Sequence, residues 1–388
     1  MKRRKRKLKR WVKLVLLAAL IIIIWPIFKN SILNKNYKKE VNRTKKVVAT
    51  TKKKDSEELS LVMVGDCLLH TIVYKAADQG NGTYSFKNMF SNIAPLIKGY
   101  DLAYYNQESI IGGKKLGLSS YPTFNSPEEI GDDMVDMGFN LVSLANNHTM
   151  DKGVTGVTNS VEYWRTKSGV YWSGQALSEG ERIKNIRVEE KNGIKYAFLS
   201  YTTVTNGLLP PAGKEYMSNV YSDEKAKKDI ELIKDKVDLI IVAMHWGVEY
   251  TNQEVPEQKK IAEYLSSLGV DLIIGAHPHV IEPITYVNDT LVFYSLGNFV
   301  SSQDSSDKLT GALASLKIKK KNNKIEFDDI KVNLIYTSFN RTPPYNFKLY
   351  PYQMLDSSIL FNYNSYYDKY KTILTSEEQS VEVVSLNW

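Results

Sequence analysis

Histidines, carboxylates and amides stand directly behind short apolar runs in this chain. The sequence has five histidines; four follow such runs, and the fifth, His70, lies four residues beyond Asp66. Imidazole combined with carboxylate suits zinc, iron or manganese, whereas calcium or magnesium alone would call for oxygen ligands. The candidates for a metal-dependent site are Asp66, His70, Asn106, Glu108, Asn147, His148, Asp151, His245, Glu249, His277 and His279.

The spacing of two histidines indicates how many metal ions to expect. One histidine behind a strand is more often a surface or core residue, but four of them with acids and amides at the same positions indicate a site. His277 and His279 form a His-x-His turn that directs two imidazoles toward neighbouring points, which suits metal ions roughly 3.5 to 4 Å apart. We therefore expect two divalent ions, with Mn, Zn and Fe all open.

The apolar runs alternate with helix-like stretches. This alternation predicts an α/β domain with mainly parallel central strands, and ligands collect at the carboxyl ends of such strands. Expected strands cover residues 59–64, 102–106, 141–145, 196–200, 239–244 and 272–275. Expected helices cover 86–97, 127–137, 154–167, 223–236 and 256–268, with Ser126 and Ser222 as N-caps.

The pattern changes after Asn298. Residues 313–319 and 325–334 predict two strands around the turn at Lys321, Asn322 and Asn323. Seven tyrosines follow between Tyr345 and Tyr370; they form either a platform for a polymer or the packing face of an extension. We expect residues 305–388 to be a small β-rich or irregular extension.

The charge of the chain is unevenly distributed. The net charge is +8, but residues 1–54 carry +18 and the remainder carries −10. A folded part with a net negative charge lacks the basic footprint of a protein that binds a phosphate backbone, so nucleic acid is not an expected partner. The single cysteine, Cys67, excludes an intramolecular disulfide and a thiolate zinc cluster, and we expect it to be a small buried side chain.

The basic N-terminal part surrounds an apolar segment. Residues 1–10 carry eight basic side chains, and residues 14–28 carry no charged one. A cleavable signal peptide would need a small-residue site behind this run, whereas Lys29 and Asn30 follow it, so an uncleaved anchor is favoured. We expect a cytoplasmic segment 1–10, a single transmembrane helix at 11–28, a basic stalk at 29–58, and the main domain outside the cell membrane.

Six motifs together resemble the signature set of the poly-γ-glutamate capsule synthesis family, the CapA or PgsA type. They are GD at 65–66, NQE at 106–108, ANNHTMDKG at 145–153, HWGVEY at 245–250, GAHPHV at 275–280 and YSLGNF at 294–299. The family is similar to calcineurin-like metallophosphoesterases. The resemblance implies a four-layer αββα sandwich over residues 59–304. It also implies a membrane-attached role in making or exporting an anionic capsule polymer such as poly-γ-glutamate, beside membrane synthase subunits.

The resemblance also implies roles for individual residues. Glu108 takes the place of the bridging carboxylate, and His148 assists the leaving group or the attacking oxyanion. Asp151 either orients a histidine or caps the helix that begins near residue 154. The implied metal ligands are Asp66, Glu108, Asn147, His245, His277 and His279.

Two departures from the phosphoesterase pattern stand out. Leu68 occupies the position of a ligand histidine, and the bridging carboxylate, Glu108, belongs to an N-x-E motif. His70 either replaces the missing imidazole or is a surface histidine. Asn106 and Glu249 are further possible contributors; Glu249 is either an outer base or a solvated loop acid. We expect Asn298 to shape a turn at the floor of the pocket.

These observations leave the function open between two classes. One is a metal-dependent phosphoesterase with His148 as proton donor, serving the capsule or another cell-envelope pathway. The other is an accessory protein that uses the same pocket to guide a polyacidic chain. Because the folded part is negative, such a polymer would need the metal ions or the basic stalk as a local focus.

Overall fold

Two β-sheets form the framework of the protein. The computed structural model describes residues 57–386, so the predicted transmembrane helix at 11–28 and the stalk up to residue 56 lie outside the described residues. Within the described range, no helix combines the length and the apolar character needed to span a membrane.

The larger sheet has nine strands, in the order β14-β13-β12-β1-β2-β3-β4, with β11 beside β1 and β15 beside β13. Strands β1 to β4 run parallel, the pairs β1–β12, β12–β13 and β13–β14 are antiparallel, and β11 and β15 are parallel to β1 and β13. Its strands are β1 (Glu58–Cys67), β2 (Leu102–Gln107), β3 (Leu141–Ser143), β4 (Tyr171–Ser173), β11 (Asn298–Val300), β12 (Thr310–Lys321), β13 (Lys324–Ser338), β14 (Lys348–Pro351) and β15 (Glu382–Val383).

The smaller sheet has six strands in the order β5-β6-β7-β8-β10-β9. Its central strands β6, β7, β8 and β10 are parallel, and the two edge strands are antiparallel. Its strands are β5 (Glu189–Lys191), β6 (Ile194–Thr202), β7 (Leu239–His245), β8 (Leu272–Ala276), β9 (Ile284–Val287) and β10 (Thr290–Phe293).

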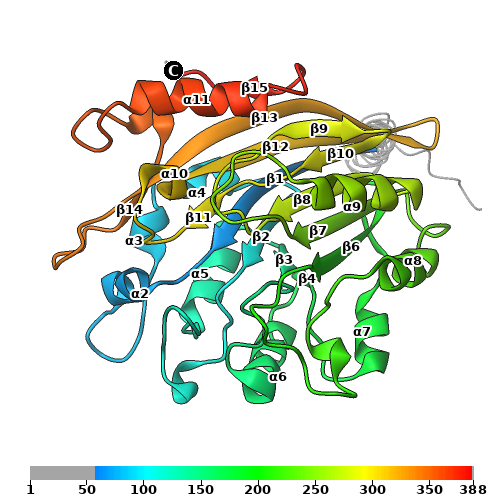
Figure 1. The fold of residues 1–388 in the computed structure, drawn as a ribbon, viewed down its shortest axis with the longest axis horizontal. Helices are drawn as coiled ribbons and strands as arrows, with labels where there is room; N and C mark the ends of the chain where they lie inside the picture. The colour runs from blue at the N-terminus through cyan, green and yellow to red at the C-terminus, as the bar shows by residue number, and fades with distance from the viewer. Residues whose placement is uncertain (1–56, 387–388) are drawn as a thin grey trace, which may run out of the picture. The chain divides into compact units, whose positions relative to one another are not determined.

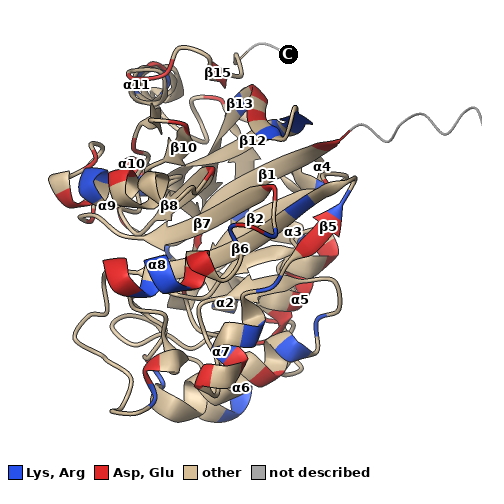
Figure 2. Ribbon diagram, turned by 90° about the vertical axis from the view of Figure 1, so that its right-hand side faces the viewer, with Lys and Arg blue, Asp and Glu red and all other residues tan. Residues whose placement is uncertain are grey.

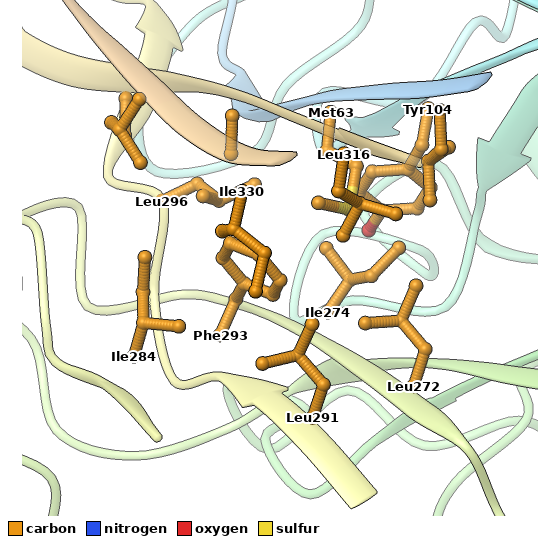
Figure 3. Close-up of a cluster of buried hydrophobic side chains, with 14 of the residues drawn as sticks. Met63, Tyr104, Leu272, Ile274, Ile284, Leu291, Phe293, Leu296, Leu316 and Ile330 are labelled. Carbon is orange, nitrogen blue, oxygen red and sulfur yellow. The ribbon is translucent and has the colours of Figure 1, made fainter. Parts of the chain in front are cut away.

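Alternating side chains place each central strand between two cores. On β7, Ile241 packs into the core between the sheets while Val242 packs outward under helices. On β1, Met63 faces inward and Val62 outward in the same way. Figure 3 shows the inner core, where residues of both sheets meet. Burial on both faces explains why these strands are continuous apolar runs rather than alternating ones.

Helices cover the outer face of each sheet, so the layers run helices, sheet, sheet, helices (Figure 1). In Figure 2, acidic and basic residues alternate along the ribbons of α7 and α8, while β7 and β8 contain neither. The helices are α2 (Thr71–Ala77), α3 (Lys87–Phe90), α4 (Ala94–Ile97), α5 (Glu129–Met137), α6 (Gly153–Arg165), α7 (Glu179–Asn185), α8 (Asp223–Glu231), α9 (Pro256–Ser267), α10 (Ser306–Leu309) and α11 (Tyr363–Leu374).

Two local predictions about helices were wrong. The helix expected at 86–97 is two short ones, α3 and α4, because Pro95 lies in the first turn of α4 and cannot continue a preceding helix. Ser126 does not cap α5, whose N-cap is Glu128 without a side-chain bond, since the Ser126 hydroxyl bonds that of Ser109 at 2.8 Å. The Ser222 cap is confirmed: its Oγ accepts the amide of Lys225 at 3.2 Å.

Residues 305–386 pack as part of the sandwich. They belong to the same compact unit as the rest of the described chain, and the predicted pair of strands forms the long hairpin of β12 and β13, with β12 paired to β1. Six of the seven tyrosines between 345 and 370 contact the core between the sheets. Tyr352 and Tyr370 are fully buried, so packing rather than an open platform describes these side chains.

Candidate metal centre

The carboxyl ends of strands from both sheets meet at one place in the sandwich. In the larger sheet, Asp66 of β1 is in register with Asn106 of β2 and with Asn298 of β11. In the smaller sheet, β7 ends at His245, beside the end of β8. Figure 1 shows these strands ending on the same side of the molecule. Polar side chains that follow the strands are therefore gathered from segments far apart in the sequence.

Five predicted ligands form two overlapping groups. Glu108, His245 and His277 make one group, and Asp66, Glu108 and His279 make the other; within each group the ligand atoms lie within 4.8 Å of one another. Glu108 belongs to both, with its Oε1 3.8 Å from His245 Nε2 and 3.6 Å from His279 Nε2. All five side chains are buried. This sharing is the arrangement expected of a carboxylate between two metal ions.

Glu108 is a buried acid whose carboxylate accepts no hydrogen bond. Neither of its carboxylate oxygens has a hydrogen-bond partner, and burial raises the pKa of this carboxyl well above its ordinary value. A buried carboxylate that accepts no hydrogen bond is unfavourable, so a cation bound between Glu108 and its histidine neighbours would reduce the penalty. His277 Nδ1 is likewise buried without a partner. The donor set of imidazoles and carboxylates therefore fits divalent zinc, iron or manganese.

The three ligand imidazoles titrate differently because their neighbours differ. Burial and the nearby His279 lower the pKa of His277 to about 4, and burial lowers the pKa of His245 well below the usual range. Burial alone would also lower the pKa of His279, but the carboxylates of Glu108 and Asp66 raise it to about 9. His277 and His245 are thus neutral and can donate a ring nitrogen lone pair to a metal ion. His279 is protonated and pairs with Glu108 and Asp66.

Neighbouring amides orient the ligands. Asn106 Nδ2 donates to Asp66 Oδ1 at 2.8 Å, and the backbone amide of His277 donates to Asp66 Oδ2 at 3.2 Å. His279 Nδ1 lies 3.0 Å from Asn298 Oδ1. The sequence interpretation of Asn298 as a turn residue missed this contact. Its position in YSLGNF, behind another apolar run, was the available signal.

The turn after β8 is strained where the ligands lie. His277 has φ of 101° and His279 has φ of 60°, a left-handed backbone that residues other than glycine rarely adopt. Such conformations cost of order 1–3 kcal/mol each and persist where surrounding contacts enforce them. Here they bring both imidazoles to the same buried cluster.

Asn147, His148 and Asp151 approach the centre from the segment between β3 and α6. Asn147 Oδ1 lies 3.0 Å from His245 Nε2. His148 Nδ1 lies 2.8 Å from Asp151 Oδ2, which also accepts the backbone amide of Phe124 at 2.6 Å. The N-cap of α6 is Lys152, without a side-chain cap. Asp151 therefore has the contacts of an orienting residue and not those of a helix cap.

A cavity of about 650 Å³ opens beside this cluster. His148, His279, His70 and Glu249 line it. His70 belongs to neither ligand group; its Nδ1 accepts the amide of Ser302 at 3.3 Å, and burial with the charge of His279 lowers its pKa to about 4. Glu249 is exposed. Both residues thus lie in the wall of the cavity, while the expected ligand position Leu68 is a buried apolar contact in the same wall.

Cys67 has the inert character expected of it. Its side chain is buried, and burial together with the charges of Glu108 and Asp66 raises the pKa of its thiol well above the ordinary value. A thiol that stays protonated is a poor nucleophile and a poor metal ligand, so Cys67 fills space beneath the cluster.

Comparison with known proteins gives a consistent family. The model of the bacterial capsule synthesis protein PGA_cap matches residues 60–303. The PGA biosynthesis protein CapA of Bacillus subtilis (strain 168) is 31% identical over 275 residues, covering 68% of each chain. The capsule biosynthesis protein CapA of Bacillus anthracis is 28% identical over 311 residues, covering 78% of this chain and 71% of that one.

Among solved structures, that of TT1561 from Thermus thermophilus matches 69% of this chain and 97% of its own, with a TM-score of 0.38 and 10% identity. The family match covers the whole smaller sheet, strands β2, β3, β4 and β11 with nearly all of β1 in the larger sheet, and all the residues of the metal-ligand groups. This chain belongs to the bacterial capsule synthesis protein family PGA_cap.

Proposed function

We propose that this protein is a metal-dependent phosphoester hydrolase of capsule biosynthesis, with two divalent ions between the carboxyl ends of its two sheets. The observation that carries the proposal is Glu108, a buried carboxylate that belongs to both ligand groups and has no hydrogen-bond partner. One group supplies His245 and His277 besides Glu108, and the other supplies Asp66 and His279. Asn147 supports the first group through His245.

The chemistry divides between the ions and the side chains. Two bound divalent ions supply Lewis acidity and make water a better nucleophile at neutral pH. The Asp151 carboxylate accepts the Nδ1 proton of His148 at 2.8 Å, which fixes the ring and leaves Nε2 as the nitrogen that exchanges a proton with the reacting oxygens; in the imidazolium form Nε2 carries a proton. From the wall of the cavity, His148 then gives that proton to the leaving oxygen. Asn106 and Asn298 keep Asp66 and His279 in position.

We propose the poly-γ-glutamate system as the biological setting. The two Bacillus relatives are named for capsule or PGA biosynthesis, and their similarity covers at least two thirds of this chain. In this proposal residues 11–28 anchor the protein in the cell membrane, with the main domain outside and synthase subunits as neighbours. The basic residues between 29 and 54 attract an acidic polymer at low ionic strength.

A second candidate is the accessory protein that guides the polymer without hydrolysis. It is favoured by Leu68, which fills a phosphoesterase ligand position with an apolar side chain. Each ligand group has three histidines or acids, and a group that lacks one imidazole should bind its ion weakly. One tightly held ion without phosphodiester hydrolysis would favour this candidate over the enzyme.

The test is the metal content of Glu108→Gln. Removing the shared carboxylate should reduce bound Mn²⁺ or Zn²⁺ after dialysis from about two ions per chain to fewer than one and abolish hydrolysis of a generic phosphodiester. The matched control is Glu282→Gln, since Glu282 is also fully buried and burial raises its pKa to about 8. This control should keep its metal. Equal metal content in both variants would refute the proposed centre.

A further inference from the structure

The cavity beside the metal centre has an apolar wall that the chemistry of the centre does not use. Its apolar lining residues are Leu68, Tyr121, Pro122, Phe124, Leu208 and Tyr250. Tyr121 is 78% exposed, Tyr250 48% and Leu208 40%, and the next residue in the chain, Leu209, is 64% exposed. Large apolar side chains that gather in solvent around one opening are typical of a ligand site.

The wall carries little positive charge. Among its lining residues, all within the described part of the chain, there is no lysine or arginine, and Glu249 adds an acid. Lys308 lies over the ring of Tyr250 at 4.0 Å, but its charge is paired with Asp304 at 2.7 Å. Arg341 donates to the backbone carbonyl of Gln303 and also faces Asp304.

These features do not suit a polyacidic chain as the reacting ligand of this cavity. A polymer with a carboxylate on every residue gains nothing from apolar walls, and the acid Glu249 in the lining repels it. The walls favour a ligand that has one negative charge at the metal centre and an apolar body on the side of Tyr121, Leu208 and Tyr250.

We infer that the substrate of this cavity is an amphiphilic phosphoester, with its phosphate at the ligand groups and its hydrocarbon chain along the aromatic and aliphatic wall. This inference rests on the proposed function and specifies its substrate class. Two sources share this chemistry: phospholipids with straight chains, and isoprenoid phosphates with branched chains. Both are found at a membrane surface, where the proposed anchor would keep the protein.

Binding of three phosphodiesters with one negative charge each tests the inference. Dimethyl phosphate, decyl methyl phosphate and geranyl methyl phosphate, of which the last two have chains of equal carbon number, are titrated calorimetrically into the full chain in lipid nanodiscs with Mn²⁺, with empty nanodiscs as the blank. Each methylene that leaves water strengthens binding about fourfold, so at least one of the long probes should bind at least about tenfold more tightly than dimethyl phosphate. A preference for the decyl probe indicates lipid, and one for the geranyl probe indicates isoprenoid.

Variants locate the effect on the wall. Tyr121→Ser combined with Leu208→Ser should reduce the advantage of the long probe to less than about threefold; both side chains line the cavity and are exposed, Tyr121 to 78% and Leu208 to 40%, so the melting temperature should stay unchanged. Phe361→Ser is the control, because Phe361 is 74% exposed and does not line the cavity. Equal affinity for all three probes, or the same loss in the control, would overturn the inference.

The two proposals fail separately. If Glu108→Gln loses its metal but the parent protein shows no preference for a long chain, the metal centre stands and the amphiphilic substrate is refuted. If the chain-length preference is present and Glu108→Gln retains its metal, the cavity binds amphiphiles and the hydrolytic centre is refuted.

Discussion

Burial and neighbouring charges give the histidines beside Glu108 different pKa values. His277 and His279 are two residues apart, yet the pKa of His277 falls to about 4 and that of His279 rises to about 9. Burial lowers both, and the difference arises because Glu108 and Asp66 face His279. Without a metal ion, protonated His279 supplies the positive charge that faces Glu108 and Asp66.

Metal binding should therefore release protons. His279 is protonated at neutral pH because its pKa is about 9, and a metal ion must displace that proton. The affinity for Mn²⁺ should rise by up to about tenfold per pH unit between about pH 6.5 and 8.5, and level off above about pH 9. Titration calorimetry in buffers with different ionisation enthalpies measures the released proton directly. An affinity that stays constant across this range would contradict the assignment of His279 as a ligand.

Asp151 should act on the rate and not on metal content. Asp151→Asn keeps the shape of the side chain but weakens its bond to His148 Nδ1, so phosphodiester hydrolysis should fall about 10- to 100-fold with unchanged bound metal. The control is Asp133→Asn: this buried acid also accepts a backbone amide, from Phe86 at 2.7 Å, and it is no part of the site. A similar loss in the control, or a loss of metal in Asp151→Asn, would contradict the orienting role.

At the scale of elements, the end of β1 depends on a close approach between two backbones. β1 pairs with β11 and β2, and the register places Asp66 beside Asn298 and Asn106. A Cβ atom on Gly65 would lie 1.8 Å from the carbonyl oxygen of Gly297. Only glycine fits there. Gly65 therefore allows the close contact between the strands, and the next residue, Asp66, supplies the metal ligand.

Gly65→Ala should therefore disturb both the fold and the site. The added methyl must push β1 from β11, at a cost of roughly 1–3 kcal/mol or more, and the shift of Asp66 should lower metal affinity. The matched control is Gly180→Ala in α7, where an added Cβ would meet no atom within 4 Å; it should be neutral or stabilise by up to ~1 kcal/mol. Chemical denaturation and metal titration of both variants measure these effects. Equal stability of the two would refute the steric explanation.

Strands and helices could be predicted from the sequence where their burial requires a recognisable pattern of apolar residues. The six expected strands correspond to β1, β2, β3, β6, β7 and β8, because strands covered on both faces must be continuously apolar. β4 and β11 have three residues each, as β3 has, but the apolar run of β3 continues through Leu144 and Ala145, whereas β4 is followed by Gly174 and β11 by Ser301. Their apolar runs are therefore too short to indicate a strand. Helix α7 was missed because it has no buried residue and hence no apolar stripe.

At the scale of the whole molecule, the C-terminal residues complete the core between the sheets. β12 pairs with β1 from Glu58 to Met63, and Tyr352, Tyr370 and Leu374 are buried in the inner core. Each such side chain contributes roughly 1.5–3 kcal/mol when fully buried, and the net stability of a domain is only about 5–15 kcal/mol. Residues 305–388 should therefore be required for folding.

Truncation tests this requirement. A protein of residues 57–388 contains every residue of the three cores and should unfold in one cooperative thermal transition by circular dichroism. A protein of residues 57–304 lacks β12 and β13 and should show no such transition. A cooperative transition in the shorter protein would show that the C-terminal residues are a separable extension.

The sequence by itself determined which side chains can serve as ligands and which apolar runs become central strands. Both are local properties: residue type limits the chemistry, and burial on two faces is visible in a run of a few residues. The order of the motifs also determined the family, which the matching capsule synthesis model bears out.

Only the tertiary structure decided how these residues meet. That Glu108 belongs to both groups, that Asn298 contacts His279, that Asp151 bonds His148 rather than α6, and that an apolar wall borders the centre all depend on two sheets packing face to face. Such contacts join segments as far apart as Asp66 and His277. Their distances are set by the shared core, which no local pattern in the chain encodes.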